Sequence, residues 1–558
     1  MGGILGALGG YYINAITYGI CTGIINGAFT GYQMFLELFN HLKNIKDKKI
    51  NDITALMQAI KDNNLNVVLC LLYIGTDVNA TTVLTLANIE NKPDIITLLL
   101  EHYKITDYSA MYARISSKRG ELGPILRFAG GPEALWSSNL LRSFRHVLLP
   151  MLTTRDAINL RLVCKEFKEE VEKFPWNDMK TLIRGDIEKW RMCFPQAISA
   201  NISQYEENFN SNGRRTPVVD AEFVHLKGIK ILYMRDCKQV TNAAFIHLKG
   251  IHTLDMSSCP QITDAAFVHL KGIHTLNMSY CNQETITDAA FEHLKGIQTL
   301  NMSWCDQETI TDAAFEHLKG IKILKMINCL QMTDAAFEHL KGIHTLDMSC
   351  CNLETITDAA FVQLRGINTL NMSYCTQITD AAFENLKGIH TLNINGCTQI
   401  TDDAFEHFKG IQTLYMSGCN QETITDAAFE YLIGIHTLGM SRCYQETITD
   451  AAFVHLKGIQ ILDISFCRQI TDSTFEHLKG IHTLYMCGCD QETITDAAFV
   501  HLKGIHTLDI SVCRQLTNTV FVYLKGIHTL DVRGCKPDQI SAARELKTHV
   551  LYSIPSLL

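Results

Sequence analysis

The sequence predicts an α/β repeat solenoid, a parallel sheet with short helices, preceded by small all-α modules. Two observations predict this fold class. A glycine recurs fourteen times between residues 228 and 526 at steps of 22 or 24 residues, and a cysteine follows each of these glycines nine residues later. A fixed period of this length indicates stacked equivalent units that together bury one continuous core.

The composition narrows the class of protein. The chain has 558 residues, of which 47% are hydrophobic and 19% charged, which is typical of a folded chain of several domains. Its net charge of −9 argues against a nucleic-acid partner. Fourteen of the twenty cysteines fall in the repeated position, where we expect buried free thiols. Unpaired thiols in this number favour a reducing compartment, so we expect a cytoplasmic location.

Residues 1–40 form an apolar, glycine-rich segment, and residues 2–36 contain no charged side chain. Gly19, Gly23, Gly27 and Gly31 are spaced as in the close helix pairs of membranes. Asn14 and the many glycines make the segment only modestly apolar. Two interpretations stay open, a membrane-associated helix and an apolar segment that is buried in an assembly.

Residues 52–104 contain two degenerate helix pairs. Thr54-Ala55-Leu56 and the following Ala59 form the first copy, and a second copy follows after 28 residues. This pattern resembles the ankyrin repeat, in which a Thr-Pro-Leu signature opens each unit. The alternative is a generic helical hairpin.

Residues 139–178 form a short helical module. The run Leu-x-x-Arg-Asp-x-x-x-Leu-Arg-x-Val-Cys-Lys-x-Phe extends from Leu152 to Phe167, and Asp156 is placed to cap a helix. The pattern resembles the F-box, which implies docking on a Skp-type adaptor and through it on a cullin. The family's opening Leu-Pro would lie near residue 140, where this chain has Leu140-Leu141. The resemblance implies these adaptor-binding residues: Leu149, Leu152, Leu160, Val163, Cys164 and Phe167. The alternative is a helical linker.

Residues 179–219 are expected to form a cap and a loop, residues 220–541 fourteen repeats, and residues 542–558 a C-terminal tail or cap. In one repeat, Asp264 or Thr263 caps a short helix and Gly272 ends it in the left-handed conformation. The pattern Ile-x-x-Leu-x-Met-x-x-Cys follows, and its four residues are expected to point inward: Ile273, Leu276, Met278 and Cys281.

That pattern resembles the leucine-rich repeat, most closely the cysteine-containing type of F-box–leucine-rich-repeat proteins. The resemblance implies a horseshoe with its sheet on the concave side. The combination of ankyrin-like, F-box-like and leucine-rich modules is similar to proteins of giant amoeba-infecting viruses, which would place the chain in a host cytoplasm.

Because strand side chains alternate, the residues flanking Leu276 and Met278 are expected to face the concave side, including the frequent serine after the methionine. The position between them and the one before each cysteine vary. Variation in a near-constant frame predicts recognition, although drift at tolerant positions is the alternative. The target-binding candidates are Tyr233, Tyr280, Trp304, Tyr374, Tyr415, Phe466, Tyr485, Asp347, Asp463 and Asp509.

The remaining polar columns are predicted to be solvated surface. Lysines such as Lys271 and aspartates such as Asp264 form rows of opposite sign, and eighteen histidines fall in two further columns. Regular rows lack the converging ligands of a metal site, so no metal or other cofactor is expected. We find no phosphate loop and no nucleophile or metalloprotease motif, which predicts a non-catalytic chain.

These observations support two main hypotheses. In the first, the chain is the substrate receptor of an SCF-type cullin–RING ubiquitin ligase, whose F-box binds the adaptor and whose concave face binds an unknown target protein. In the second, it is a non-catalytic interaction scaffold without ubiquitin transfer, anchored at a membrane through residues 1–36. A small-molecule sensor, as in some plant F-box receptors, is a weaker third.

Overall fold

The computed structural model describes residues 149, 152–161, 165–183, 185–204, 217–351, 354–546 and 549–551. The chain divides into two compact units, which are described separately: residues 1–181 with 193–196, and residues 182–192 with 197–558. The predicted apolar segment 1–40 and the ankyrin-like segment 52–104 lie outside the described residues. Among the residues that are described, no helix is long and apolar enough to cross a membrane.

The described part of the first unit contains two short helices, α11 (Thr154–Arg161) and α12 (Lys165–Lys173). The expected cap, Asp156, lies inside α11 rather than before it. The first residue of the helix is instead held from a distance, since Thr154 donates its backbone N–H and its hydroxyl to the carboxylate of Asp178, at 2.6 and 2.8 Å. Arg161 binds Glu172 at 2.7 Å and so ties α11 to α12.

The second unit is built on one parallel sheet of sixteen strands in chain order, with each strand paired only to its sequence neighbours. Leucine pairs with leucine across successive strands, so the repeats stack in register. The sheet runs one strand beyond each end of the predicted array. The strands are β1 (Ser199–Asn201), β2 (Ile231–Tyr233), β3 (Thr253–Asp255), β4 (Thr275–Asn277), β5 (Thr299–Asn301), β6 (Ile323–Lys325), β7 (Thr345–Asp347), β8 (Thr369–Asn371), β9 (Thr391–Asn393), β10 (Thr413–Tyr415), β11 (Thr437–Gly439), β12 (Ile461–Asp463), β13 (Thr483–Tyr485), β14 (Thr507–Asp509), β15 (Thr529–Asp531) and β16 (His549–Leu551).

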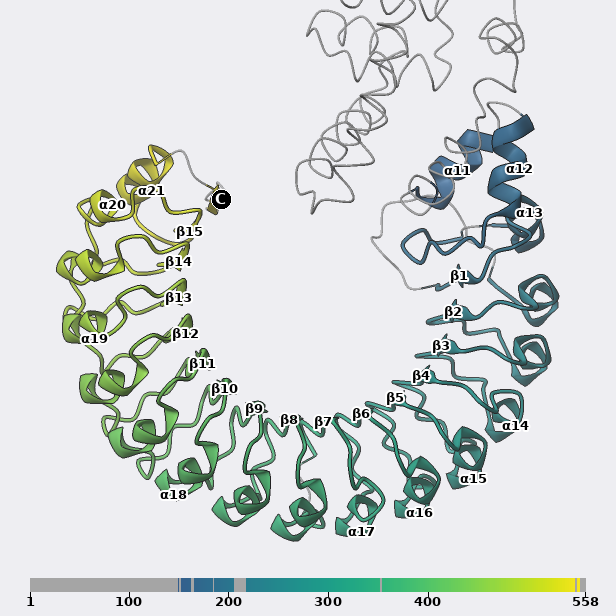
Figure 1. The fold of residues 1–558 in the computed structure, drawn as a ribbon, viewed down its shortest axis with the longest axis horizontal. Coiled ribbons are helices and arrows are strands. Elements are labelled where there is room, and N and C mark those ends of the chain that lie inside the picture. Colours follow the sequence, from purple (N-terminus) through teal and green to yellow (C-terminus); the bar gives the residue numbers. More distant parts are fainter. Residues whose placement is uncertain are drawn as a thin grey trace, which may run out of the picture. The chain divides into compact units, whose positions relative to one another are not determined.

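Short helices return the chain from each strand to the next, and they line the outer side of the arc while the strands line its inner side (Figure 1). The α-helices are α13 (Ile187–Cys193), α14 (Asp264–Phe267), α15 (Asp288–Phe291), α16 (Asp312–Phe315), α17 (Asp334–Phe337), α18 (Asp402–Phe405), α19 (Asp472–Glu476), α20 (Val520–Tyr523) and α21 (Pro537–Arg544). Tighter 3-10 helices cover Asp220–Leu226, Asn242–Leu248, Glu292–Leu294, Glu316–Leu318, Asp358–Leu364, Asp380–Leu386, Glu406–Phe408, Asp426–Leu432, Asp450–Leu456 and Asp496–Leu502. The predicted solenoid is therefore confirmed.

Each repeat has the predicted helix start and helix end, and the structure shows which of the two candidate residues caps the helix. Thr263, not Asp264, is the helix cap, because its hydroxyl accepts the backbone N–H of Ala265. Gly272 has φ of 83°, the left-handed conformation expected at the helix end, and the equivalent glycines agree.

The aspartate column joins neighbouring repeats instead of forming the solvated row that the sequence predicted. The carboxylate of Asp264 accepts the backbone N–H of Thr287 at 2.8 Å and its hydroxyl at 2.7 Å. The same pair of bonds recurs at the successive junctions. At one junction Asn242 replaces the aspartate: its Oδ1 accepts the backbone N–H of Thr263, and its amide donates to the Thr263 hydroxyl. We call this set of contacts the Asp–Thr ladder. It satisfies the donors of each helix start from the preceding repeat.

The core of the array consists of repeated columns of alanine, phenylalanine, leucine, isoleucine, methionine and cysteine, almost all fully buried. The fourteen repeat cysteines are free and buried, as predicted. Each repeat-column thiol from Cys259 onward donates to a backbone carbonyl of the preceding repeat, for instance Cys281 to Met256 at 3.3 Å. Burial raises the pKa of Cys281 to about 11 and that of Cys419 to about 12, so these thiols stay neutral.

Candidate functional site

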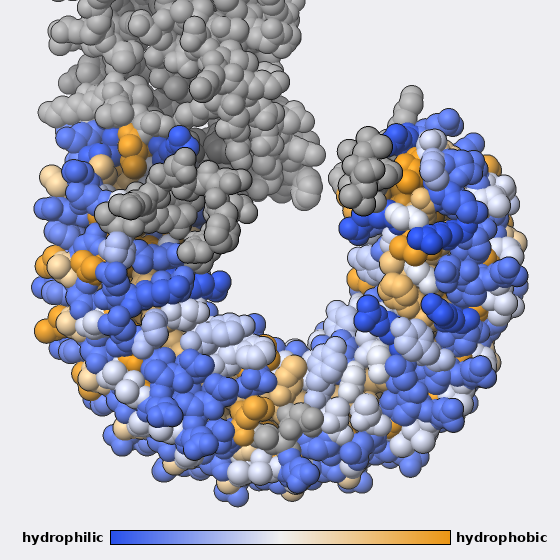
Figure 2. Space-filling model, turned by 180° about the vertical axis from the view of Figure 1, so that it is seen from behind, coloured by the Kyte–Doolittle hydropathy of each residue, from blue (hydrophilic) through white to orange (hydrophobic). Residues whose placement is uncertain are grey.

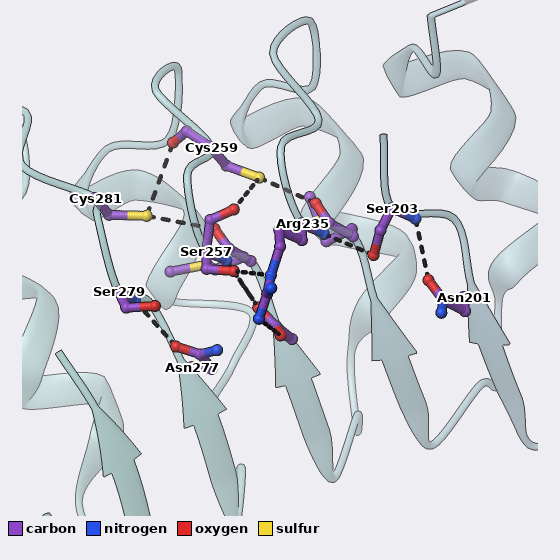
Figure 3. Close-up of polar contacts among 11 residues, drawn as sticks. Asn201, Ser203, Arg235, Ser257, Cys259, Asn277, Ser279 and Cys281 are labelled. Atoms are coloured by element: carbon purple, nitrogen blue, oxygen red, sulfur yellow. Dashed lines mark hydrogen bonds and ion pairs between the residues drawn. The ribbon is translucent and has the colours of Figure 1, made fainter. Parts of the chain in front are cut away.

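The candidate site is the surface that begins where each strand ends. The strands are only three residues long, and the central leucine is buried while the residue after it is part-exposed. Where that residue is Asn or Asp, its side chain accepts the backbone N–H two residues later, as from Ser279 to Asn277 at 3.1 Å. Figure 3 shows this turn at Asn277 and again between Asn201 and Ser203. Part of the variation in this column therefore has a structural explanation.

The serine column lies beside the strand-end column, as predicted, but is mostly covered: the hydroxyl of Ser257 donates to the carboxylate of Asp255 at 2.6 Å, and that of Ser373 donates to Asn371 at 2.9 Å. Ser279 and Ser303 are buried, with 7% and 4% of their surface exposed, and most of their equivalents are similar. Neighbouring side chains cover these serines from the same side, as Arg235 does when its Nε donates to the hydroxyl of Ser257 at 3.0 Å.

The residue before each repeat cysteine has a left-handed backbone in every repeat, which the sequence analysis did not foresee. Four of the fourteen are glycine, for which φ near 70° is unstrained. The other ten have φ between 54° and 62°, a conformation that is costly for aromatic and β-branched residues. We call these fourteen residues the turn column: Asp236, Ser258, Tyr280, Trp304, Asn328, Cys350, Tyr374, Gly396, Gly418, Arg442, Phe466, Gly488, Val512 and Gly534.

Most of the predicted aromatic candidates are exposed. Tyr280, Trp304, Tyr374 and Phe466 belong to the turn column, and only Phe466 of these four is part-buried. The strand-end tyrosines are also exposed: Tyr233, Tyr415 and Tyr485.

The three carboxylate candidates are part-buried, and each accepts a hydrogen bond from the backbone of its own turn. Asp347 and Asp463 accept the backbone N–H of the residue two positions later, at 3.2 and 2.9 Å. Asp509 makes the same turn at 2.8 Å. Burial, and secondarily the charge of Asp531, raises the pKa of Asp509 above its usual value. These carboxylates hold the turns that shape the surface.

The aromatic rings of the turn column have different neighbours. A Cβ atom on Gly396 would lie 2.7 Å from the ring of Tyr374, and one on Gly488 would lie 2.3 Å from the ring of Phe466, so these rings lie against the glycine of the next repeat. The guanidinium of Arg442 also lies 5.4 Å from the centre of the Phe466 ring. Tyr280 and Trp304 instead stack on each other, with centroids 5.7 Å apart and planes inclined by 6°.

A column of glutamines, which the sequence analysis also missed, fastens the turns from behind. The side-chain amide of Gln283 donates to the carbonyls of Cys259 and Ile262, at 3.2 and 2.7 Å. Gln421 and Gln515 repeat this contact. A Gln stands two residues after all but two of the repeat cysteines, and this column was the available signal in the sequence.

One of the two histidine columns forms stacks. His482, His506 and His528 lie with ring centroids 4.5 and 4.4 Å apart. Desolvation, followed by repulsion from His528 and His482, lowers the pKa of His506. Within the described ranges, no group of three or more His, Cys, Asp or Glu side chains could hold a metal ion.

The adaptor-binding candidates are only partly described. Leu149 is fully buried and Leu152 is part-buried. Leu160 lies in α11 and Phe167 in α12, but their side chains, like Val163 and Cys164, are outside the described residues. A neighbour that was not among the candidates, Ile158 on α11, is 37% exposed and adds an accessible apolar side chain.

Comparison with known families identifies the family of the repeat array. The model of the BspA-type leucine-rich repeat region matches residues 221–322, 284–412 and 398–528, which together cover more than half of the chain. The chain belongs to the BspA-type leucine-rich repeat family. The ankyrin-repeat model matches three copies over residues 25–110, which confirms the predicted repeat type. The match has one copy more than the two predicted over 52–104, and it overlaps the apolar segment 1–40. The F-box-like residues 139–178 fall outside both matches.

No curated protein matches this leucine-rich repeat chain. Among solved structures, it is similar to a chain of the yeast Rad7–Elc1 complex, with 18% identity, a TM-score of 0.38, and coverage of 52% of this chain and 83% of that one. A chain of the Drosophila Toll–Spatzle complex has 14% identity and a TM-score of 0.39, with coverage of 61% and 56%. A chain of the TLR13–ssRNA13 complex has 17% identity and a TM-score of 0.41, with coverage of 62% and 61%. The repeat types make the chain a protein of the interaction-scaffold class.

Proposed function

We propose that this leucine-rich repeat protein is the substrate-recognition subunit of an SCF-type ubiquitin ligase. Its array holds a target protein, and residues 139–178 dock a Skp-type adaptor and through it a cullin. The polypeptide is non-catalytic and acts in the reducing cytoplasm, where its column of free thiols is stable. It promotes transfer by holding a target lysine near the charged ubiquitin carrier, which raises the effective concentration.

The observation that carries the recognition part of the proposal is the turn column. Fourteen equivalent positions share one backbone conformation but carry ten residue types. Tyrosine and tryptophan occupy strained positions there, although glycine meets the same backbone requirement in four repeats. Tyr280 and Trp304 contact each other and stay exposed, and exposed aromatic residues held in a strained conformation favour a role in binding.

The adaptor part is supported by the F-box-like pattern from Leu152 to Phe167 and by the small helical pair that carries it. Val171, Ala157 and Trp176 are buried, and Trp176 stacks on Phe194 with centroids 4.9 Å apart. Ile158 gives α11 an exposed apolar side chain, which is the type of contact that a helical adaptor surface buries.

A pull-down of the full chain with a purified Skp-type adaptor tests this proposal. We expect binding by the wild type and its loss in Leu152→Asp, Val163→Asp and Ile158→Asp. The matched control is Lys173→Gln, an exposed polar position on α12 outside the Leu152–Phe167 pattern, which should bind normally. Absence of adaptor binding by the wild type would remove the ligase proposal and leave the second hypothesis, a scaffold without ubiquitin transfer.

The target is sought by affinity purification in the presence of a proteasome inhibitor, with the intact chain compared with a chain that lacks residues 139–178. A substrate should be retained by both chains, but only the intact chain should carry it in a ubiquitin-modified form. Equal modification in both cases contradicts the proposal.

A further inference from the structure

Repeats 3 and 4 of the array differ from the rest at the turn column. Tyr280 and Trp304 are its only adjacent pair of aromatic residues, and they are 55% and 41% exposed. Their rings are parallel and offset, so each ring supports its neighbour on one face and leaves its other face or its edge open. Because both have φ near 60°, each ring is held at a backbone cost that glycine would avoid.

The loops that follow these two rings are acidic. The segments 275–287 and 299–311 contain three carboxylates, Glu284, Asp306 and Glu308, and no lysine or arginine. All three side chains are exposed. Two of them belong to the inserted Glu-Thr pairs, whose threonine binds the preceding repeat, as Thr309 does through the carbonyl of Ile286 at 2.7 Å. The inserted pair therefore fixes the loop and leaves its carboxylate in solvent.

The same column shows what such rings can bind. In repeats 10 and 11 the guanidinium of Arg442 lies over the ring of Phe466, so an aromatic residue at this position is accessible to a cation from the side of the preceding repeat. The turn-column neighbours of Tyr280 and Trp304 are Ser258 and Asn328, so that column places no cation beside these two rings. The array surface is mostly hydrophilic, with scattered apolar residues (Figure 2), which does not favour recognition through a large hydrophobic patch.

We infer that Tyr280 and Trp304, together with Glu284, Asp306 and Glu308, form a docking site for an arginine-rich segment of a partner protein. We call it the aromatic–acidic patch. The rings receive a guanidinium by stacking and cation–π attraction, and the carboxylates attract the remaining positive charge. Arginine is favoured over lysine because its planar group can stack on a ring and bind a carboxylate at the same time. The inference rests on the proposed function, because it concerns how the array holds a target.

Fluorescence anisotropy with the full chain and a labelled (Arg-Ser)6 peptide tests the patch. We expect saturable binding to the wild type, weaker binding of (Lys-Ser)6 and none of (Glu-Ser)6. Trp304→Gly combined with Tyr280→Gly should weaken (Arg-Ser)6 binding about tenfold, since cation–π contacts are lost. Tyr374→Gly is the matched control, because Tyr374 has the same backbone and is exposed but is followed by a loop without a carboxylate.

The charges have a control of their own. The triple variant Glu284→Gln, Asp306→Asn, Glu308→Gln should weaken binding and reduce its dependence on salt. The same change at Glu422 and Glu446, the equivalent inserted residues of repeats 9 and 10, should alter binding less than twofold. Thermal melting checks that the variants are folded. If a glycine variant melts early, Trp304→Asn replaces it, since Asn328 occupies the equivalent position in repeat 5.

Three results overturn the inference: unchanged (Arg-Ser)6 binding in the double glycine variant, an equal loss in Tyr374→Gly, or tighter binding of an oligo-thymidine 12-mer than of (Arg-Ser)6. The last result would assign the rings to nucleic-acid stacking. Adaptor pull-down with the same variants separates this site from the ligase proposal. If the patch variants no longer bind the peptide but still bind the adaptor, the result supports the aromatic–acidic patch. If Leu152→Asp no longer binds the adaptor but still binds the peptide, the result bears only on the ligase proposal.

Discussion

The Asp–Thr ladder and the turn column occupy two different regions of every repeat, and they tolerate sequence change in opposite ways. At the ladder, the same carboxylate accepts the same two bonds from a threonine of the next repeat, and Asn242 is the sole exception among the described junctions. At the turn column, one backbone conformation carries ten residue types. The comparison separates residues that hold repeats together from residues that the stack leaves free to vary.

The energetic reason lies in what each group would lose. A ladder carboxylate that is replaced leaves two donors of the next repeat without a partner, and such donors are costly when they are part-buried. A turn-column side chain points away from the core, and its backbone N–H is satisfied whatever the residue, as Tyr280 N–H is by the carbonyl of Ser303 at 2.9 Å. Replacing a turn-column side chain therefore leaves no hydrogen bond unmade, whereas replacing a ladder carboxylate leaves two donors without a partner.

The largest expected effect concerns the buried thiols that back the turn column. Their folded-state pKa is raised, for example to about 12 at Cys237 and Cys443, because burial disfavours the thiolate. The free energy of unfolding should thus be highest below about pH 8.5, where the thiols are neutral in the folded and the unfolded chain. It should fall as the pH rises toward 12, by about 1.4 kcal/mol per pH unit for each thiol in a cooperative unit. Urea unfolding followed by circular dichroism at pH 8, 9.5 and 11 measures this. A double variant, Cys419→Ala with Cys443→Ala, should show a shallower pH dependence, and an unchanged slope would mean that the thiols do not remain neutral.

The next effect distinguishes a core residue from a surface residue at the end of α14. Phe267 in α14 is fully buried, whereas the adjacent Val268 is 47% exposed. Phe267→Ala should cost about 3–5 kcal/mol of unfolding free energy through cavity formation, and Val268→Ala less than about 0.5 kcal/mol. Chemical denaturation of both variants checks the difference. Similar losses would show that Val268 is covered in solution.

A third prediction concerns the ladder directly. Asp312 accepts the backbone N–H and the hydroxyl of Thr333 at 2.9 and 2.6 Å. Asp312→Ala should cost about 1.5–3 kcal/mol because both donors lose a charged acceptor. Asp312→Asn should cost less than about 1 kcal/mol, since Asn242 makes the corresponding contacts to Thr263 at 2.9 and 2.8 Å. If both variants lose the same amount, the charge rather than the pair of bonds stabilises the junction.

Much of this fold followed from the sequence because a repeat displays its constraints many times. The glycine and cysteine columns fixed the period, the buried strand and the left-handed helix end, all of which the structure has. The ladder was not predicted, because an aspartate beside a threonine also reads as a helix cap. Only the stacking of Asp264 against Thr287, 23 residues later, gives the carboxylate its second role.

The site was harder to predict for a physical reason. Alternation predicted which side of the sheet the serines lie on but not how far the adjacent repeats cover them, and Ser279 and Ser303 are buried. Positive φ is visible in a sequence where glycine requires it, but Tyr280 and Trp304 carry no such signal. Glycine at the equivalent positions 396, 418, 488 and 534 was the available clue.

The smallest predicted effect asks whether the turn column is strained in its own right. Val512 has φ of 62°, which is unfavourable for a β-branched residue, while Gly534 has φ of 70° at the equivalent position of the next repeat. Val512→Gly removes that strain but increases the entropy of the unfolded chain, so a net gain of about 0.5 kcal/mol is expected. Val268→Gly is the control, because Val268 follows α14 with right-handed backbone angles (φ −56°), and it should lose about 0.5 kcal/mol. A loss at Val512 as large as at Val268 would mean that packing of the Val512 side chain against Gly534 stabilises the array, and that the turn column varies less freely than its ten residue types indicate.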